Sequence, residues 1–130
     1  RIIRGDLPSA KVFETDRILA FMDAYPQVKG HTLVVHKASR ARNLLDAEPE
    51  VLDELILAVQ RISRAVKSAL KPDGIVVTQF NGEPAGQTIY HLHFHILPRY
   101  AGQAVGRHAA GGLCDMGELN RTAKLIASAL

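Results

Sequence analysis

The alternation of side chains in residues 88–97 constrains the fold more than any other feature of the sequence. Apolar residues and histidines alternate there, in the order Tyr90, His91, Leu92, His93, Phe94, His95 and Ile96. Successive side chains of a β-strand point to opposite faces of its sheet, so this period of two predicts a strand over residues 88–97. One face of that strand is apolar and suits a core, and we expect the three imidazoles to project together from the other face.

Four further runs of β-branched and apolar residues predict the other strands of a sheet. They cover residues 12–14, 18–22, 31–35 and 74–80. Most of the connections between strands are too short for the crossover that a parallel pair requires. The sequence therefore predicts an α+β fold with a five-stranded antiparallel sheet.

Two stretches have the apolar spacing of an amphipathic helix. Residues 50–70 form the main helix, which we expect to begin at an Asp46 N-cap and to end in residues 71–74, where a proline and a glycine interrupt it. Asp115 and Glu118 have the spacing of a capping box, which predicts a second, C-terminal helix.

Composition limits the possible partners of the chain. Its 130 residues, 47% of them hydrophobic, suffice for one core and one domain. The net charge of +3 comes from scattered basic residues, which favours small anionic ligands over nucleic acid polymers. Cys114 is the only cysteine, which excludes an internal disulfide and leads us to expect a reducing, cytoplasmic location. No apolar run reaches the roughly 18 residues that span a bilayer, so we expect no membrane partner.

The three histidines allow more than one chemistry. Isolated histidines are often satisfied core residues, and two imidazoles of a strand can chelate a metal if Asp23 or His31 supplies a further ligand. The outer two Cα atoms of the row lie roughly 13 Å apart on a straight strand, too far for all three rings to bind one ion. A phosphate ester or anhydride suits a linear row better, because a neutral imidazole can attack phosphorus while a neighbour binds an oxygen.

The segment before the histidines supports a phosphate site. Gly82 and Gly86 permit close approach of the backbone, and the Gln87 amide and the Thr88 hydroxyl can donate hydrogen bonds to phosphate oxygens. An ordinary wide hairpin loop would have a similar composition, so this segment gains its meaning from the histidines beside it.

Residues 81–99 resemble the signature of the histidine triad (HIT) family, in which a Gly-Gln-(Ser/Thr) run precedes His-x-His-x-His and two apolar residues. The resemblance extends over residues 2–100, and residues 101–130 resemble a C-terminal extension of bacterial members. It implies a single HIT domain over residues 1–130. Residues 101–112 are rich in Gly and Ala, which predicts a mobile loop within that extension. The family forms homodimers in which a strand and the main helix of each subunit build one continuous sheet.

The family resemblance assigns roles to particular residues. It implies that His93 is the nucleophile of a nucleotidyl-histidine intermediate, that His95 holds the phosphate and helps the leaving group, and that His91 orders the row. Gln87 and Thr88 match catalytic residues that contact the phosphate. The residues that match substrate-binding positions are Asp23 for the ribose, Asn81 and Gly86 near the phosphate, and Ile2, Leu7, Phe21 and Ala24 for a purine base.

The sequence departs from the family pattern at two places, one at the ligands of a structural zinc and one at a residue typical of the phosphoramidase branch. Members with a structural zinc carry a cysteine pair and a further histidine, whereas this chain has one cysteine and Ser39 near the histidine position, so we expect no metal and no cofactor. The phosphoramidase branch has an asparagine eleven residues before the first triad histidine, where this chain has Phe80, with Asn81 one place later.

These residues lead to one main hypothesis and three alternatives. The main one is a homodimeric hydrolase or transferase that cleaves purine nucleoside phosphoramidates or related conjugates at the α-phosphate. The first alternative is a dinucleoside polyphosphate hydrolase. The second is a nucleotide-binding sensor with little turnover, and the third is a metalloprotein with two strand histidines as ligands.

Overall fold

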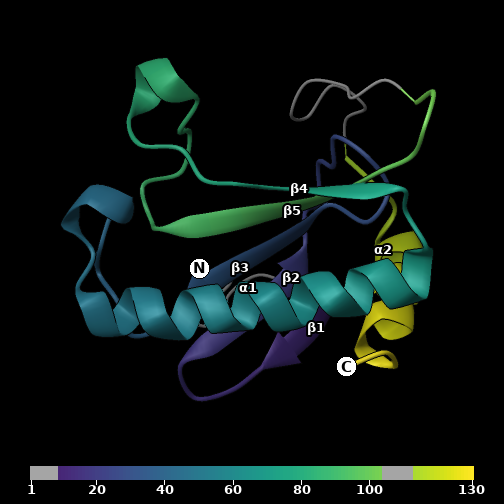
Figure 1. Ribbon diagram of the computed structural model, residues 1–130, viewed down its shortest axis with the longest axis horizontal. Helices are drawn as coiled ribbons and strands as arrows, with labels where there is room; N and C mark the ends of the chain where they lie inside the picture. Colours follow the sequence, from purple (N-terminus) through teal and green to yellow (C-terminus); the bar gives the residue numbers. More distant parts are fainter. Residues whose placement is uncertain (1–8, 104–112) are drawn as a thin grey trace.

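A computed structural model of the chain describes residues 9–103 and 113–130. Figure 1 shows one sheet with helices packed against it. The strands are β1 (Lys11–Glu14), β2 (Ile18–Met22), β3 (Thr32–His36), β4 (Gly74–Thr78) and β5 (His93–Arg99). The helices are the 3-10 helix η1 (Leu44–Asp46), α1 (Pro49–Leu70), the 3-10 helix η2 (Glu83–Ala85) and α2 (Met116–Ala127).

The five strands form an antiparallel sheet in the order β1-β2-β3-β5-β4. This arrangement confirms the predicted α+β fold. The last strand in sequence, β5, enters between β3 and β4, so the histidine strand has a hydrogen-bonded neighbour on each side. The backbone that carries the histidines is therefore held more firmly than that of an edge strand.

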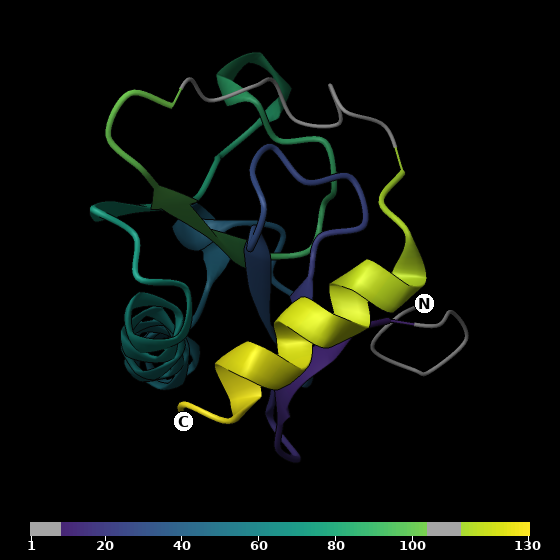
Figure 2. The same ribbon diagram turned by 90° about the vertical axis from the view of Figure 1, so that its right-hand side faces the viewer.

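Both α-helices cover the same face of this sheet. The core cluster joins sheet residues such as Ala20 and Val34 to Ile62 of α1 and Ile126 of α2, all four fully buried. In Figure 2 the view runs along α1, and α2 crosses in front of the strands. The apolar stripes predicted for the two helices thus account for one side of the core.

The other face of the sheet carries His93 and His95. A second buried cluster lies there, formed by Leu19, Phe21, Leu33 and Val35. The β3–β5 register places Leu33 opposite His95 and Val35 opposite His93. Residues opposite each other in an antiparallel pair point to the same face, so His93 and His95 adjoin an apolar surface.

The predicted start of the histidine strand is wrong. Alternation placed it at residue 88, but β5 begins at His93 and continues to Arg99. Ahead of it, Leu92 donates its backbone N–H to the Ala41 carbonyl (3.0 Å). This bond, together with the bends over residues 89–91, keeps that segment outside the sheet. His91 consequently precedes the strand instead of sharing its face.

The predicted helix ends are partly confirmed. Asp46 does not cap α1, because its carboxylate accepts the backbone N–H groups of Arg42 and Asn43 at the start of η1. The helix begins instead at Pro49, whose fixed φ and missing N–H suit a first turn. At the second helix the prediction is confirmed, since the Asp115 carboxylate accepts the Glu118 N–H at 3.1 Å.

Among the described residues, no helix is long and apolar enough to cross a membrane. The greater part of the predicted loop over residues 101–112 lies outside the described residues, as do Ile2 and Leu7 of the predicted base pocket.

Candidate active site

His93 makes a hydrogen bond that determines its tautomer. It is the first residue of β5, and its Nδ1 lies 2.7 Å from the His91 carbonyl oxygen. A carbonyl oxygen can only accept, so Nδ1 must carry the hydrogen, and in the neutral ring the lone pair is then on Nε2. The backbone of the first triad histidine thereby fixes the tautomer of the second.

His91 is itself held by the neighbouring strand. Its Nε2–H donates to the backbone carbonyl of His36, the last residue of β3, at 3.0 Å. His91 thus connects β3 to His93 through one side-chain bond and one backbone bond. This arrangement agrees with the expectation that His91 orders the row, although it does so from outside the strand.

His95 belongs to a different set of contacts. Its ring is 4.8 Å from that of His93 and 5.4 Å from that of Phe80, measured between centroids. Its Nδ1 lies 2.9 Å from Nε2 of the fully buried His31, and the Asp23 carboxylate is 3.6 Å from the same Nε2. The sequence offered His31 only as a possible metal ligand and gave it no role in the main hypothesis, yet it contacts a triad histidine directly.

Asp23, His31 and His95 are all buried, and one ligand atom from each lies within 4.8 Å of the other two. This set contains one strand histidine, not the two that the metal alternative takes, but it offers three possible metal ligands. However, His31 Nδ1 accepts the backbone N–H of Gln27 at 3.2 Å, so in the neutral ring the hydrogen is on Nε2. A nitrogen that carries hydrogen has no lone pair for a metal, and the three groups therefore fit a chain of hydrogen bonds better than a metal site.

Asp23 is placed beside His31 and at the edge of a separate cavity. One carboxylate oxygen accepts the Tyr25 backbone N–H at 2.8 Å, and the other faces His31. Asp23 and His31 also line a cavity of about 250 Å³ between the 23–30 loop and α2. The predicted ribose carboxylate is thus adjacent to the triad, as its assigned role requires.

The Gln87 side chain holds the loop in place instead of facing solvent. Its amide donates to the carbonyls of Arg42 (2.7 Å) and Ile89 (3.0 Å), and its oxygen accepts from Gly82 N–H (2.8 Å) and Asn43 Nδ2 (3.3 Å). These four bonds use every donor and acceptor position of the group. The expected contact between the Gln87 amide and a phosphate would require one of them to break.

Other loop residues are positioned differently. Gly86 has φ of +113° and its Cα faces the Phe80 ring, where a Cβ would come within 3.4 Å. The Asn81 side chain accepts the Leu44 N–H at 3.0 Å and the Gln79 amide at 2.9 Å, so it ties η1 to the loop. Thr88 is exposed. Phe21 lies in the apolar cluster on the histidine face, while half-buried Ala24 packs against the main core.

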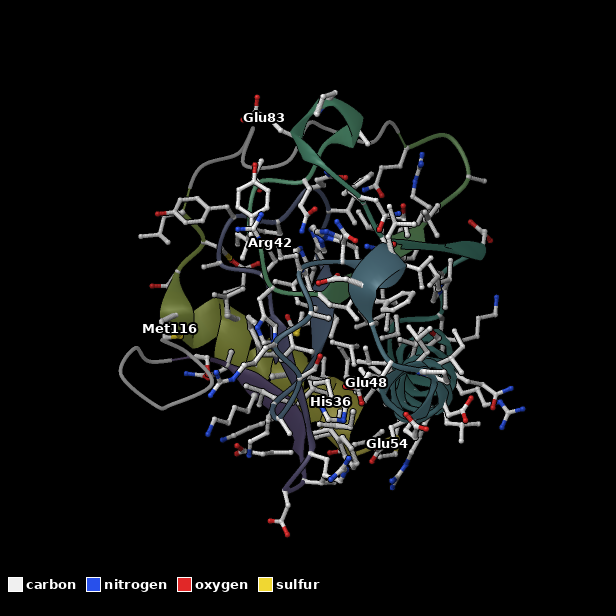
Figure 3. The ribbon with its side chains drawn as sticks, turned by 90° about the vertical axis from the view of Figure 1, so that its left-hand side faces the viewer. His36, Arg42, Glu48, Glu54, Glu83 and Met116 are labelled. Atoms are coloured by element: carbon white, nitrogen blue, oxygen red, sulfur yellow. The ribbon has the colours of Figure 1, made fainter. Side chains whose placement is uncertain are left out.

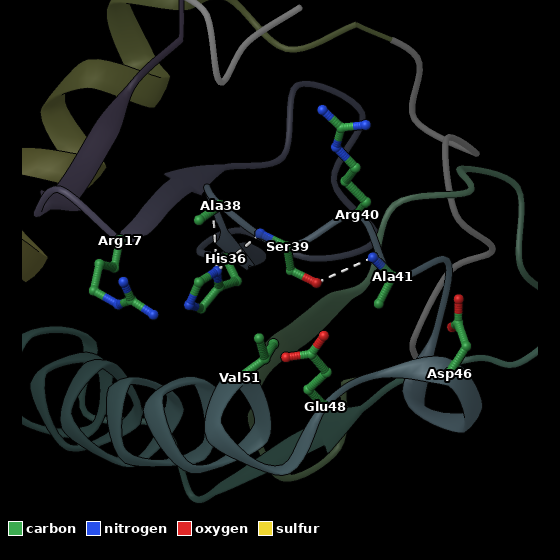
Figure 4. Close-up of a pocket in the computed structure, with 9 residues that line it drawn as sticks. All are labelled: Arg17, His36, Ala38, Ser39, Arg40, Ala41, Asp46, Glu48 and Val51. Atoms are coloured by element: carbon green, nitrogen blue, oxygen red, sulfur yellow. Dashed lines mark hydrogen bonds between the residues drawn. The ribbon is translucent and has the colours of Figure 1, made fainter.

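Another cavity, of about 530 Å³, has none of the three triad side chains in its lining; Figure 4 shows residues that do line it, among them Arg17, His36 and Glu48. His36 projects into it, with Nδ1 accepting the Ala38 and Ser39 N–H groups. Its Nε2–H donates to Glu54 at 3.1 Å, a pair visible in Figure 3. The Arg17 guanidinium, and after it His36, lower the pKa of Glu54 to about 2.

Comparison with known proteins settles the family. The sequence pattern of the HIT domain matches residues 4–102. This chain belongs to the HIT family. Protein hit from Bacillus subtilis is 43% identical over 100 residues, which make up 77% of this chain and 68% of that protein. A HIT-like protein of Methanocaldococcus jannaschii is 41% identical over 104 residues, 78% of each chain.

Solved structures of HIT proteins share the fold. A Hit-like protein from Bartonella henselae, described as involved in cell-cycle regulation, has a TM-score of 0.91 and 47% identity over 99% of this chain and 92% of its own. A histidine triad nucleotide-binding protein of Sulfolobus tokodaii has a TM-score of 0.88 and 31% identity over 98% of this chain and 87% of its own. Family membership indicates a nucleotide hydrolase or transferase.

Proposed function

We propose that the protein cleaves purine nucleoside phosphoramidates or related nucleotide conjugates at the α-phosphate through a nucleotidyl intermediate on His93. The observation that carries this proposal is the hydrogen bond from His93 Nδ1 to the His91 carbonyl, which leaves a lone pair on Nε2. A neutral imidazole with a fixed lone pair is ready to attack phosphorus without a separate base.

The reaction would occur in two displacements. In the first, the Nε2 lone pair forms a bond to the α-phosphorus, the phosphorus–nitrogen bond of the substrate breaks, and the amine leaves with that electron pair and takes up a proton. In the second, a water oxygen attacks phosphorus, the bond to His93 breaks, its electron pair returns to Nε2, and one proton of the water is released. The net products are the amine and the nucleoside monophosphate.

The apolar surface beside the histidines supports a nucleoside as substrate. Phe21, Leu33 and their neighbours form a buried cluster on the face that carries His93 and His95. Asp23 sits close to that face with one carboxylate oxygen held by the Tyr25 N–H. A base on the apolar cluster and ribose hydroxyls on Asp23 would place the α-phosphate near the two imidazoles.

The experiment is hydrolysis of adenosine phosphoramidate with a search for the intermediate. Wild type should release AMP, and rapid quenching in denaturant at alkaline pH, which preserves a phosphorus–nitrogen bond, followed by mass spectrometry should find adenylate on His93. His93→Ala should lose activity by at least about 100-fold while keeping its far-ultraviolet circular dichroism. Equal turnover by wild type and His93→Ala would refute the proposal, and binding without turnover would favour a nucleotide sensor.

Comparing rates on adenosine phosphoramidate and on a diadenosine polyphosphate would decide between the two hydrolase branches. Higher kcat/KM on the phosphoramidate is the expected outcome.

We also propose that the protein is a homodimer joined through β4. This strand is an edge of the sheet, and Val76 and Val77 on it are 41% and 43% exposed. An apolar groove between β4 and α1, bordered by Ile56 and Ile75, runs beside them. An exposed apolar edge strand is suited to pairing with another chain.

Sedimentation equilibrium at micromolar concentration should give a dimer. Val77→Glu should shift the mass toward that of one chain, because it places a charge at the pairing edge. Leu125→Glu is a matched control, since Leu125 is 54% exposed on α2 and away from that edge. A monomeric wild type, or equal dissociation by both variants, would contradict this assignment.

A further inference from the structure

His31 contacts a triad histidine and takes no part in the mechanism derived above. It is fully buried immediately before β3, between the Asp23–Gly30 loop and β5. Its two ring nitrogens face different groups. Nδ1 accepts the Gln27 N–H at 3.2 Å, and Nε2 lies 2.9 Å from Nδ1 of His95.

These two contacts determine where the hydrogens are. A backbone N–H can only donate, so Nδ1 of His31 must accept and Nε2 must carry the hydrogen of the neutral ring. That hydrogen points at His95 Nδ1, which must therefore accept. The remaining hydrogen of His95 is then on Nε2, the nitrogen turned away from His31.

The same contacts oppose a second proton on His95. A hydrogen on His95 Nδ1 would meet the Nε2–H of His31, and moving that hydrogen to His31 Nδ1 would place it against the Gln27 N–H. Among residues 9–103 and 113–130, the groups that lie against His95 include Asp23, His31 and His93, with Phe80 packed beside the ring. The Asp23 carboxylate favours positive charge in this group, whereas the Gln27 N–H disfavours it.

We infer that His31 is a positioning residue that holds His95 as a neutral imidazole with Nε2–H directed away from β3, so that His95 donates a hydrogen bond to a phosphoryl oxygen and does not supply the proton of the leaving group. This inference rests on the proposed function and makes it more specific. A neutral imidazole that gave up its only N–H proton would become an imidazolate, which is unfavourable in water near neutral pH. The departing amine therefore takes its proton from solvent.

The chemistry is that of a fixed electrophile. A neutral imidazole held in one tautomer can stabilise the charge on an oxygen without changing its own protonation state. Such a donor acts equally on any leaving group, because it contacts an oxygen that stays on phosphorus. An acid catalyst, in contrast, matters only when the leaving group requires a proton.

The first test uses the wild-type protein without substrate. Nitrogen-15 NMR of histidine-labelled protein should show His95 with Nε2 protonated and Nδ1 unprotonated at neutral pH, and His31 with the same tautomer. A hydrogen on His95 Nδ1, either as the other tautomer or as imidazolium, would overturn the inference even if the enzyme hydrolyses phosphoramidates.

The second test compares two leaving groups. Adenosine phosphoramidate releases an amine that must be protonated, and the p-nitrophenyl ester of AMP releases a phenolate that need not be. His31→Leu should lower kcat on both by a similar factor, about tenfold. His31→Gln keeps an N–H donor within reach of His95 and should stay within about threefold of wild type. Loss on the amine substrate alone would show that His95 is an acid and would refute the inference.

His36→Leu is the control for a purely structural effect. His36 is the last residue of β3, is buried like His31, and shares with its partner Ile18 the face of the sheet that the helices cover. This variant should lose stability, yet leave the tautomer of His95 and the ratio of the two rates unchanged. If wild type hydrolyses neither substrate, the proposed function fails, whereas the NMR result still decides the hydrogen positions.

Discussion

Gly30→Ala offers a sensitive test of how the site is supported. Gly30 directly precedes His31 and has φ of +91°, a conformation that L-residues rarely adopt. A Cβ at this position would lie 2.5 Å from Cδ1 of Leu70, at the end of α1, and 3.0 Å from Cγ of Pro98 in β5. The glycine therefore lets three elements meet.

Two costs add up in this variant. The positive φ costs an alanine about 1–2 kcal/mol. Overpacking typically costs about 1–3 kcal/mol, but the Leu70 methyl is the end of a flexible side chain and can rotate away, which places this cost at the lower end. The expected loss in the free energy of unfolding is about 2–3 kcal/mol. At about 3–4 °C per kcal/mol for a domain of this size, the melting temperature should fall by about 6–12 °C.

Urea denaturation followed by circular dichroism would measure this loss. Gly74→Ala is the matched control, because no atom lies within 4 Å of a Cβ built there, and its stability should change by less than about 1 kcal/mol. A Gly30→Ala protein as stable as Gly74→Ala would refute the close approach of α1 and β5 at this point. Since Gly30 directly precedes His31, its variant should also lower the proposed phosphoramidase activity.

Three other substitutions test local features of the fold. The pKa of Glu54 is depressed to about 2, chiefly by Arg17, so its contribution to stability is present above the usual value of 4.5 and is lost as the pH falls toward 2. Glu54→Gln should therefore be less stable than wild type at pH 7 in urea titrations, and the difference in the free energy of unfolding between the two proteins should shrink below pH 4.5. A difference that does not change with pH would contradict this reasoning. Asp115→Ala removes the N-cap of α2 and should lower the free energy of unfolding by about 1 kcal/mol in the same assay. An unchanged free energy of unfolding would mean that the cap does not form in solution. Lys71→Gly should stabilise the protein by up to about 1 kcal/mol, because Lys71 has φ of +52° at the C-cap of α1, and a destabilised variant would argue against that backbone conformation.

The fold followed from patterns that lie within short stretches of sequence. The apolar run of residues 18–22 and the apolar stripe of residues 50–70 each correspond to an element of the structure, because a short continuous run suits a strand buried on both faces and a stripe suits a helix buried on one. Asp46 shows the limit of such reasoning. Its place in the sequence suited the N-cap of α1, but its carboxylate instead accepts the backbone N–H groups of Arg42 and Asn43.

The start of β5 was predicted wrongly for a different reason. Alternation continues through residues 88–92, but a period of two describes only how side chains alternate and does not ensure that a neighbouring strand is in register. In the structure Leu92 bonds to Ala41 and the His91 side chain bonds to the His36 carbonyl, contacts made between segments far apart in sequence. No local pattern contains that information.

The candidate site also has residues that the sequence could identify and one whose role depends on contacts in the folded chain. The three histidines and Asp23 were identifiable from residue type and family resemblance, whereas the contribution of His31 depends on which atoms face its two nitrogens. An isolated histidine before a strand gives no signal of this kind. Its position becomes informative only when the Gln27 N–H fixes one nitrogen and His95 occupies the other, since one backbone donor then determines the hydrogen positions of two rings in succession. The hydrogen of His93 is fixed by a carbonyl acceptor and that of His95 by an imidazole donor, so the two neighbouring rings suit the two roles that we propose for them, attack on phosphorus and donation to its oxygen.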